Sequence, residues 1–439
     1  MIENLMQKNN ANDRKKIDCI IKSTGLDYDE FSIEEFWSAI EHLERTLNFQ
    51  YIRMDFGVPG LTPPETSLSA HQQTFQHGQI PQQYPPYSGV PQLTAAMAEF
   101  IGNRLNTKIS SRNIFVTCGA TQALFVAQAV AAKLKAKANS VAFLTPNYPP
   151  MCTQARFLGM EISTIEVDDR KGVSLIGAIR TVFETGKVAA FCWASPSNPS
   201  WRVLNDEELL GIANLCKEFN VIPIEDLTYI GMIDSTNNVK QVCLPSIARY
   251  ADDYLLVLST SKMLSYAGER IGFLVGSDSL LDKKSNSLKA AFEVNSVRRA
   301  CGSLIFNTTG GAPHSAQYAV TSIIKAINRG DYDLDKALSI YLKRAKKLKQ
   351  LLNKHGFYLI YSQNNDEDLN GFYVSFAYPG LSEMELLQEL LYLGVTVLPL
   401  SIFGSQRRDG VRACVGRLSE DKLDILEERL VKFVGARND

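Results

Sequence analysis

Between residues 113 and 276 the sequence alternates short apolar runs with stretches of helical spacing, and this rhythm limits the fold more than any other feature. Most runs are rich in Val, Ile and Leu and lack strict apolar–polar alternation, as expected for strands covered on both faces. Apolar residues recur at helical spacing between many of the runs, for example over 122–135 and 205–219. The pattern predicts an α/β domain with a mostly parallel seven-stranded sheet flanked by helices. The predicted strands cover 113–117, 141–145, 161–167, 188–193, 221–225, 254–259 and 271–276.

The segments on either side of this block have other patterns. Residues 1–26 are polar and favour a frayed or arm-like segment, whereas Ser32 with Glu35 predicts a capping box at the start of an amphipathic helix. The stretch 54–91 is rich in Pro, Gly and Gln, which favours loop, and one way to bury it is as an arm over another subunit. After about residue 315 we expect a helix over roughly 333–355, a strand pair near 357–376, a helix at 382–393, strands at 394–400 and 411–415, and a closing helix.

These patterns predict two unequal domains, as the length of 439 residues also favours. We expect residues 1–55 to form an arm and helix that belong to the small domain. Residues 56–320 would form the large domain, and residues 321–439 a compact α+β small domain.

Composition excludes several classes of function. A formal net charge of −1 gives no electrostatic reason to expect nucleic acid or an anionic membrane as a partner. No apolar run reaches the roughly 20 residues that span a bilayer, and the start lacks the basic segment and apolar core of a signal peptide, so we expect a cytoplasmic protein. The eight cysteines are scattered without a CxxC pair or Cys/His cluster, so no disulfide framework and no metal site are expected.

Polar or small residues follow several predicted strands, at the edge of an open α/β sheet where ligands bind. Gly119, Ala120 and Thr121 follow the first strand and open a helix, where free N–H groups and the helix dipole can bind a phosphate. Small residues also begin many ordinary helices. Tyr148 follows the second strand, where its ring can stack on a flat cofactor or simply pack in a loop.

Three further polar residues follow the later strands 188–193 and 221–225. Asn198 can donate to a phenolate-type oxygen, or it can form a turn with the prolines beside it. Asp226 suits pairing with a protonated ring nitrogen deep in the crevice, with an ordinary helix N-cap as the alternative. Tyr229 lies three residues beyond Asp226.

A lysine follows the strand 254–259 in the sequence Ser-Thr-Ser-Lys, which ends at Lys262. A lysine at a buried strand end is costly unless its charge is paired or its pKa is lowered, and such lysines are apt for Schiff-base formation. Ser259 and Arg270 would supply hydroxyl and guanidinium donors to a phosphate held by the turn at Gly119.

Taken in chain order, these residues resemble a fold-type I enzyme dependent on pyridoxal 5′-phosphate (PLP), of the class I/II aminotransferase family. The resemblance covers roughly residues 50–430, and the block from Ser259 to Arg270 is its most specific part. It implies that Lys262 forms the imine with PLP and shuttles the proton between the substrate Cα and C4′, and that Asp226 keeps the pyridine nitrogen protonated. It further implies that Tyr229 and Asn198 hydrogen-bond the ring oxygen and that Tyr148 stacks on the ring. The residues implied for phosphate binding are Gly119, Ala120, Thr121, Ser259, Ser261 and Arg270.

The same resemblance assigns roles outside the sheet edge. Tyr84 resembles the tyrosine that reaches the phosphate of the neighbouring subunit, which implies a homodimer with shared sites. Arg412 resembles the arginine that grips the substrate α-carboxylate, for which a bidentate guanidinium is suited, and an exposed strand arginine is the alternative. Asn198 would also meet this carboxylate. Gly57 begins the loop, up to Gly60, that resembles the one closing over the substrate.

The chain departs from the family pattern at one point. The common motif has Gly two positions after Asn-Pro, but this chain has Ser200-Trp201. A bulky indole there could reshape the pocket mouth, which puts substrate size in doubt. Arg298 and Arg299 could meet an acidic substrate side chain, although paired arginines on a helix are more often solvated.

The implied activity is transfer of an amino group between an L-amino acid and a 2-oxo acid in ping-pong order, through PLP. The same residues would also suit a β- or γ-eliminating lyase, a cyclopropane-forming synthase or an amino-acid oxidase, because the cofactor-binding set is common to all of them. A PLP-sensing regulator would carry a DNA-binding winged helix before the fold. The leading 50 residues lack a basic recognition helix, which argues against a regulator.

Overall fold

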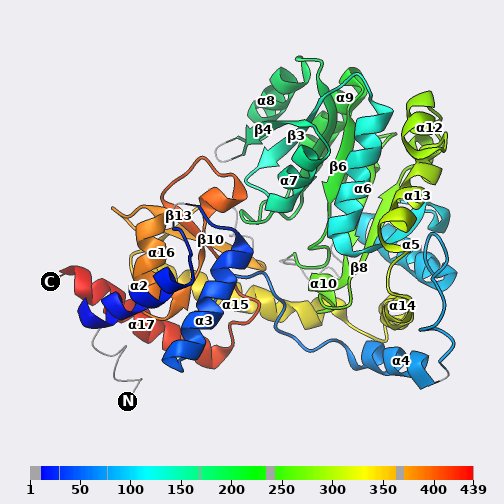
Figure 1. The fold of residues 1–439 in the computed structure, drawn as a ribbon. Helices are drawn as coiled ribbons and strands as arrows, with labels where there is room; N and C mark the ends of the chain where they lie inside the picture. Colours follow the sequence, from blue (N-terminus) through cyan, green and yellow to red (C-terminus); the bar gives the residue numbers. More distant parts are fainter. Residues whose placement is uncertain are drawn as a thin grey trace. The chain divides into compact units, whose positions relative to one another are not determined.

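The computed structural model describes residues 11–28, 30–76, 78–167, 170–233, 243–361 and 370–438. The chain forms two compact units (Figure 1). The large unit comprises Leu61–Asn198 and Arg202–Ser339, and the small unit comprises Met1–Gly60, Pro199–Trp201 and Ile340–Asp439. The domain bounds expected at residues 55 and 320 stay a prediction.

The large unit contains a seven-stranded sheet with the strand order β2-β8-β7-β6-β5-β3-β4. Strands β4, β3, β5, β6 and β7 pair in parallel, whereas β8 runs antiparallel to both β2 and β7. The predicted α/β fold with a mostly parallel sheet is therefore confirmed. The strands are β2 (Ile114–Cys118), β3 (Ser140–Thr145), β4 (Glu161–Glu166), β5 (Val188–Ala194), β6 (Ile222–Asp226), β7 (Leu255–Ser259) and β8 (Ile271–Gly276).

Helices cover both faces of this sheet, as the interior strand β5 illustrates. Ala190 and Cys192 belong to the buried apolar cluster that residues of helix α6 also line. Phe191, which points to the other face, contacts Phe183 of α8 with ring centroids 5.6 Å apart. The helices are α4 (Glu65–Gln76), α5 (Pro91–Leu105), α6 (Gly119–Leu134), α7 (Pro149–Phe157), α8 (Val173–Phe183), α9 (Asp206–Phe219), α10 (Thr260–Met263), α11 (Asp278–Leu281), α12 (Asn286–Phe292), α13 (Val297–Thr309) and α14 (His314–Arg329), with short 3₁₀ turns at Ser111–Asn113 and Ile247–Arg249.

The expectation of loop throughout 54–91 is wrong, because helix α4 lies within it. The helix packs on α14 (Figure 1). Its buried positions include the small polar residues Ser67 and Thr74, whereas Phe75 is exposed. A helix that buries small polar side chains lacks the apolar periodicity on which a sequence-based prediction depends.

The small unit combines a four-stranded antiparallel sheet, ordered β12-β13-β10-β9, with a separate parallel pair of β1 and β11. Helix α15 begins in the large unit and continues into the small unit. The elements are α2 (Ala11–Ser23), α3 (Ile33–Leu47), β1 (Ile52–Arg53), α15 (Leu334–Lys354), β9 (Tyr358–Leu359), β10 (Tyr373–Ala377), α16 (Glu383–Tyr392), β11 (Val395–Thr396), β12 (Leu398–Pro399), a 3₁₀ turn at Leu400–Phe403, β13 (Gly410–Cys414) and α17 (Glu420–Asn438).

Two sequence-based expectations for this unit need correction, and one is confirmed. The described part of the expected frayed arm is helix α2, which buries Ile17 and Ile21. The single strand expected over 394–400 is two short strands, β11 and β12, in different sheets. The capping box of α3 is present, since Ser32 Oγ accepts from the Glu35 N–H at 3.1 Å and Glu35 Oε2 accepts from the Ser32 N–H at 2.7 Å.

Candidate active site

The pairing of the strands brings several of the predicted site residues to one edge of the large sheet. Asp226 is the last residue of β6 and pairs in register with Val257 of β7. Two residues further along β7, Ser259 pairs with Gly272 of β8. On the other side of β8, Ile271 pairs with Cys118, the last residue of β2. Because β8 runs antiparallel to its neighbours, its start meets the carboxyl ends of β2 and β7 at this edge.

The predicted phosphate turn packs directly on β8, with glycine required at both contact points. Gly119 has a φ of +73°, and a β-carbon there would lie 2.4 Å from Nη2 of Arg270. A β-carbon on Gly272 would lie 2.3 Å from the carbonyl carbon of Gly119 and 2.5 Å from the amide nitrogen of Ala120. The guanidinium of Arg270 therefore lies against the start of α6, whose first N–H groups have no intrahelical acceptor. Thr121, two residues further along α6, is partly buried.

The lysine segment is held on the same strand by its hydroxyl neighbours. Ser259 is the N-cap of the one-turn helix α10, and its Oγ accepts from the Ser261 N–H at 3.1 Å. Thr260 Oγ1 donates to the carbonyl oxygen of Ile271 at 2.9 Å. Lys262, in the same turn, is half-buried. The sequence thus fixes the backbone of Lys262 against β8 at the edge that carries Arg270.

Asp226 is a buried carboxyl, with only 4% of the residue exposed. Its Oδ1 accepts from the N–H of Thr228 at 2.9 Å and from its hydroxyl at 2.6 Å. Burial raises the pKa of Asp226 to about 6, and the two hydrogen bonds from Thr228 act in the opposite direction. Residues 227–233 contain no helix, so Asp226 stabilises a turn and the helix N-cap alternative is wrong.

The remaining predicted residues of the large unit lie in four loops. Asn198 and Tyr229 are buried. Tyr148 is the N-cap of α7, beyond the end of β3, and packs partly buried against the central apolar cluster. By contrast, 83% of Tyr84 is exposed. A β-carbon on Gly310 would lie 3.4 Å from Cε1 of Tyr84, which places this tyrosine beside the C-terminal end of α13.

In the small unit Arg412 is buried, with 2% of the residue exposed, so the exposed-arginine alternative is wrong. Its guanidinium carbon lies 4.5 Å from the ring centroid of Tyr373 and 4.6 Å from that of Phe403. Its Nη2 donates to the carbonyl oxygen of Asp55. Gly57 shares this environment, since a β-carbon there would lie 2.2 Å from Oη of Tyr373. Sequence reasoning missed both rings, because no motif distinguishes them from core aromatics.

The residue that departs from the family pattern, Trp201, has a φ of +58°. Glycine adopts this left-handed conformation readily, whereas a tryptophan there is strained. Its indole is buried, and a β-carbon on Gly371 would lie 1.7 Å from Trp201 Cε2. The ring also contacts Tyr373 with centroids 6.2 Å apart. The indole of Trp201 thus occupies the space that a side chain at position 371 would need. That Trp201 reshapes the pocket mouth stays a prediction.

Arg298 is engaged within its own unit. Its Nη2 donates to Asp282 Oδ1 at 2.9 Å and to Asn113 Oδ1 at 3.0 Å. This arginine therefore holds α13 to neighbouring segments by pairing with a carboxylate of its own chain. Arg299 is exposed on the same helix.

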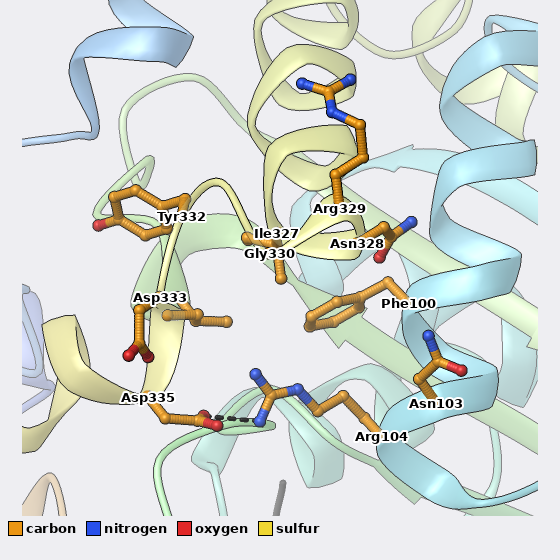
Figure 2. A pocket seen from close by; sticks show the side chains of 11 residues that line it. Phe100, Asn103, Arg104, Ile327, Asn328, Arg329, Gly330, Tyr332, Asp333 and Asp335 are labelled. Atoms are coloured by element: carbon orange, nitrogen blue, oxygen red, sulfur yellow. Dashed lines mark hydrogen bonds and ion pairs between the residues drawn. The ribbon is translucent and has the colours of Figure 1, made fainter. Parts of the chain in front are cut away.

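A separate cavity of about 430 Å³ lies where α5, the end of α14 and the start of α15 meet in the large unit (Figure 2). Its lining contains none of the predicted site residues and no lysine, histidine or cysteine. Figure 2 shows the guanidinium of Arg104 directed at Asp335, with an Nη1–Oδ1 distance of 2.6 Å. The buried arginine is thus neutralised by the chain itself, and the cavity lacks a nucleophile for the chemistry expected of the sheet edge.

Neither a membrane-spanning helix nor a metal-binding cluster occurs within the described ranges. No helix there is long and apolar enough to cross a membrane. The same residues include no group of three or more His, Cys, Asp and Glu side chains placed to hold a metal ion.

The fold and the residues at the sheet edge together define the class of the protein, a PLP-dependent enzyme with an α/β large domain. The sequence profile described as "Aminotransferase class I and II" matches residues 51–430. The chain belongs to this family and is an aminotransferase that uses PLP.

Individual relatives are distant. A probable aspartate aminotransferase of Methanocaldococcus jannaschii is 22% identical over 388 residues, which are 88% of this chain and 94% of that protein. Human kynurenine–oxoglutarate transaminase 1 is 27% identical over 270 residues, covering 58% of this chain and 60% of that protein.

Solved structures show the same fold. A single mutant of Thermus thermophilus aspartate aminotransferase has a TM-score of 0.77 at 22% identity and covers 92% of this chain and 97% of its own. An alanine aminotransferase from Pyrococcus furiosus has a TM-score of 0.76 at 21% identity, covering 93% and 98%. The substrates in the names of these proteins differ, being aspartate, kynurenine and alanine.

Proposed function

We propose that Lys262, Asp226 and Arg412 carry the aminotransferase reaction, with an L-amino acid as donor and a 2-oxo acid as acceptor. One observation carries the proposal: the strand register gathers Asp226, the Ser259–Lys262 segment and the Gly119 turn at a single sheet edge. PLP-dependent amino transfer needs three groups from the protein: a lysine, a buried carboxyl and an anion-binding turn.

The residues at this edge fit PLP. The Gly119 turn offers unsatisfied N–H groups and a helix dipole, and the guanidinium of Arg270 lies against it. Ser259 and Ser261 add hydroxyls from the neighbouring strand end. The pKa of Asp226 is raised by burial to about 6, and a protonated ring nitrogen beside it would favour its charged form. A dianionic phosphate and a cationic ring nitrogen are therefore both provided for.

When bound, the cofactor supplies an aldehyde that condenses with amines and a ring that accepts electrons from the substrate Cα. Lys262 would hold the cofactor between turnovers, and its released Nζ would move the proton between the substrate Cα and C4′ of the cofactor. Asp226 would keep the proton on the ring nitrogen. Tyr229 and Asn198 would donate to the ring oxygen, and Tyr148 would stack on the ring.

Arg412 is the proposed partner of the substrate carboxylate. The rings of Tyr373 and Phe403 lie beside its guanidinium, and a planar guanidinium is suited to a bidentate pair with a carboxylate. The contact of Gly57 with Tyr373 suggests that the loop beginning there is fitted to the same aromatic ring. Asn198 is proposed to meet the same carboxylate.

The test is a single half-reaction with a panel of amino acids. Holoenzyme without added 2-oxo acid should convert one equivalent of the amino-acid donor to its 2-oxo acid and retain the amino group. A different 2-oxo acid, added afterwards, should then take up this amino group and leave as an amino acid. Lys262→Ala should abolish both steps. Release of ammonia with turnover in the first step would contradict the proposal and favour elimination or oxidation.

We also propose a homodimer in which Tyr84 reaches the phosphate of the partner site. The proposal is supported by exposed aromatic residues close together: Tyr84, and Tyr87 stacked on Phe306 with ring centroids 5.2 Å apart. Mixing Lys262→Ala with Tyr84→Ala subunits should restore wild-type composition to about a quarter of the sites, because half of the dimers are mixed and one of their two sites is intact. A monomer by sedimentation, or no recovery on mixing, would refute it.

We propose a cytoplasmic location because the eight cysteines of the chain form no disulfide. All eight are free thiols, and Cys192, Cys216, Cys301 and Cys414 are buried. A reducing compartment keeps such thiols intact. Cell fractionation with antibody detection tests this location.

A further inference from the structure

The phosphate turn is braced by a side chain that does not belong to the predicted cofactor set. Cys118 is the N-cap of α6 and makes no side-chain capping bond. Its N–H donates instead to Oε1 of Gln122, one turn further along the helix, at 2.7 Å. Within the turn, Thr117 Oγ1 donates to the carbonyl oxygen of Gly119 at 3.0 Å. Gln122 therefore bonds back to the N–H of the N-cap residue, as the first-turn Glu or Gln of a capping box does.

The other end of the same amide is attached to helix α13. Gln122 Nε2 donates to Thr308 Oγ1 at 2.7 Å and to Thr309 Oγ1 at 3.1 Å. Both hydroxyls also donate to carbonyl oxygens of their own helix, Leu304 at 2.7 Å and Ile305 at 3.1 Å. The hydroxyl oxygens of Thr308 and Thr309 therefore act as acceptors for Gln122. The amide of Gln122 links the start of α6 to the end of α13.

The end of α13 that receives this bridge also contacts the segment that carries Tyr84. Gly310 ends the helix with a φ of +70°, beside the Tyr84 ring. A β-carbon on Gly311 would lie 2.6 Å from Cγ of Pro85, and the Gly311 N–H donates to Thr309 Oγ1 at 3.3 Å. One hydroxyl, on Thr309, therefore links Gln122 to the backbone that packs on Tyr84 and Pro85.

We propose that Gln122 is a positioning residue for the cofactor phosphate, which holds the Cys118–Thr121 turn in place from the C-terminal end of α13. The inference rests on the proposed role of this turn in binding the phosphate of PLP. It follows that phosphate affinity depends on Thr308, a residue on another helix, through the amide of Gln122. Losing the amide leaves the Cys118 N–H without its acceptor and lets the turn relax away from Arg270.

The test compares cofactor binding by apoenzyme variants with two vitamers, PLP and pyridoxal, each followed by the absorbance of the bound vitamer. Gln122→Leu should weaken PLP binding roughly tenfold, because it removes all hydrogen bonds of the bridge. Thr308→Val should weaken it roughly threefold, because it removes only one of them. The double variant should match Gln122→Leu, because both changes break the same bridge. Pyridoxal, which has no phosphate, should bind all variants within about twofold.

One control variant and one alternative variant separate loss of the bridge from general damage to the fold. Gln92→Leu changes an exposed glutamine of α5 and should leave both affinities unchanged. If Gln122→Leu unfolds, Thr308→Val, at an exposed helix end, still tests the same bond. Equal weakening of PLP and pyridoxal, or effects of the two substitutions that multiply in the double variant, would overturn the inference. Failure of the wild-type chain to bind PLP at all would instead overturn the proposed function.

Discussion

Adding one methyl group at Gly272 should destabilise the fold more than adding one at its neighbour Gly119. A β-carbon at position 272 meets two backbone atoms, at 2.3 Å and 2.5 Å, in the turn itself. Backbone atoms of a strand-to-helix turn cannot move aside individually, so the turn must shift as a whole. At position 119 the β-carbon meets the end of the exposed Arg270 side chain at 2.4 Å, which can swing away, and the added cost is the left-handed φ.

The expected magnitudes follow from these contacts. Gly272→Ala should lower the free energy of unfolding of the apoenzyme by about 1–3 kcal/mol, the usual cost of overpacking. Gly119→Ala should lower it by about 1–2 kcal/mol, the cost of a left-handed alanine. Gly268→Ala is the matched control, because a β-carbon at position 268 meets no atom within 4 Å.

Urea unfolding of the three apoenzymes and titration with PLP measure both effects. Gly272→Ala should bind PLP at least tenfold more weakly than Gly268→Ala, because the shifted turn no longer faces Arg270. The reasoning is refuted if Gly272→Ala unfolds at the wild-type urea concentration and binds PLP with wild-type affinity.

Three more predictions concern buried groups. Burial raises the pKa of Glu225 from 4.5 to about 7 in the folded protein. The stability that this carboxyl contributes is therefore lost as the pH rises from about 4.5 to about 7. In urea titrations over this range, Glu225→Gln should become more stable relative to wild type. Trp201→Gly should lower the free energy of unfolding by about 2–4 kcal/mol, a cavity cost reduced by relief of the left-handed φ, and should make Gly371→Ala tolerable, which a double-mutant cycle checks. Arg412→Lys should raise the KM for the amino acid about tenfold or more, because the bidentate edge is lost, with PLP affinity unchanged in the same preparation.

The sequence predicts the large sheet well because most of its strands are buried on both faces and are therefore rich in apolar residues, with the edge strand β4 as the exception. The same logic fails for α4, whose buried positions include Ser67 and Thr74, and for α2, whose polar composition hides the pair Ile17 and Ile21. Both helices gain their stability from packing on other elements, which local periodicity does not report.

The candidate site divides in the same way. Gly119, Asp226 and Ser259 could be found because each ends or directly follows a strand, and strand pairing brings such positions to one edge. The rings around Arg412 follow no such rule, since Tyr373 lies within a strand and Phe403 ends a 3₁₀ turn. The capping bond of Gln122 could have been predicted from the sequence, because a glutamine near the start of a helix can accept from the N–H of the residue that precedes the helix.

The proposed attachment of PLP to Lys262 can be measured directly. Purified protein mixed with PLP, reduced with borohydride and digested should yield one modified peptide, with the pyridoxyl group on Lys262. Lys262→Ala treated identically should carry none. A wild-type protein that stays unmodified, or that is labelled at another lysine while Lys262 is recovered intact, contradicts the account.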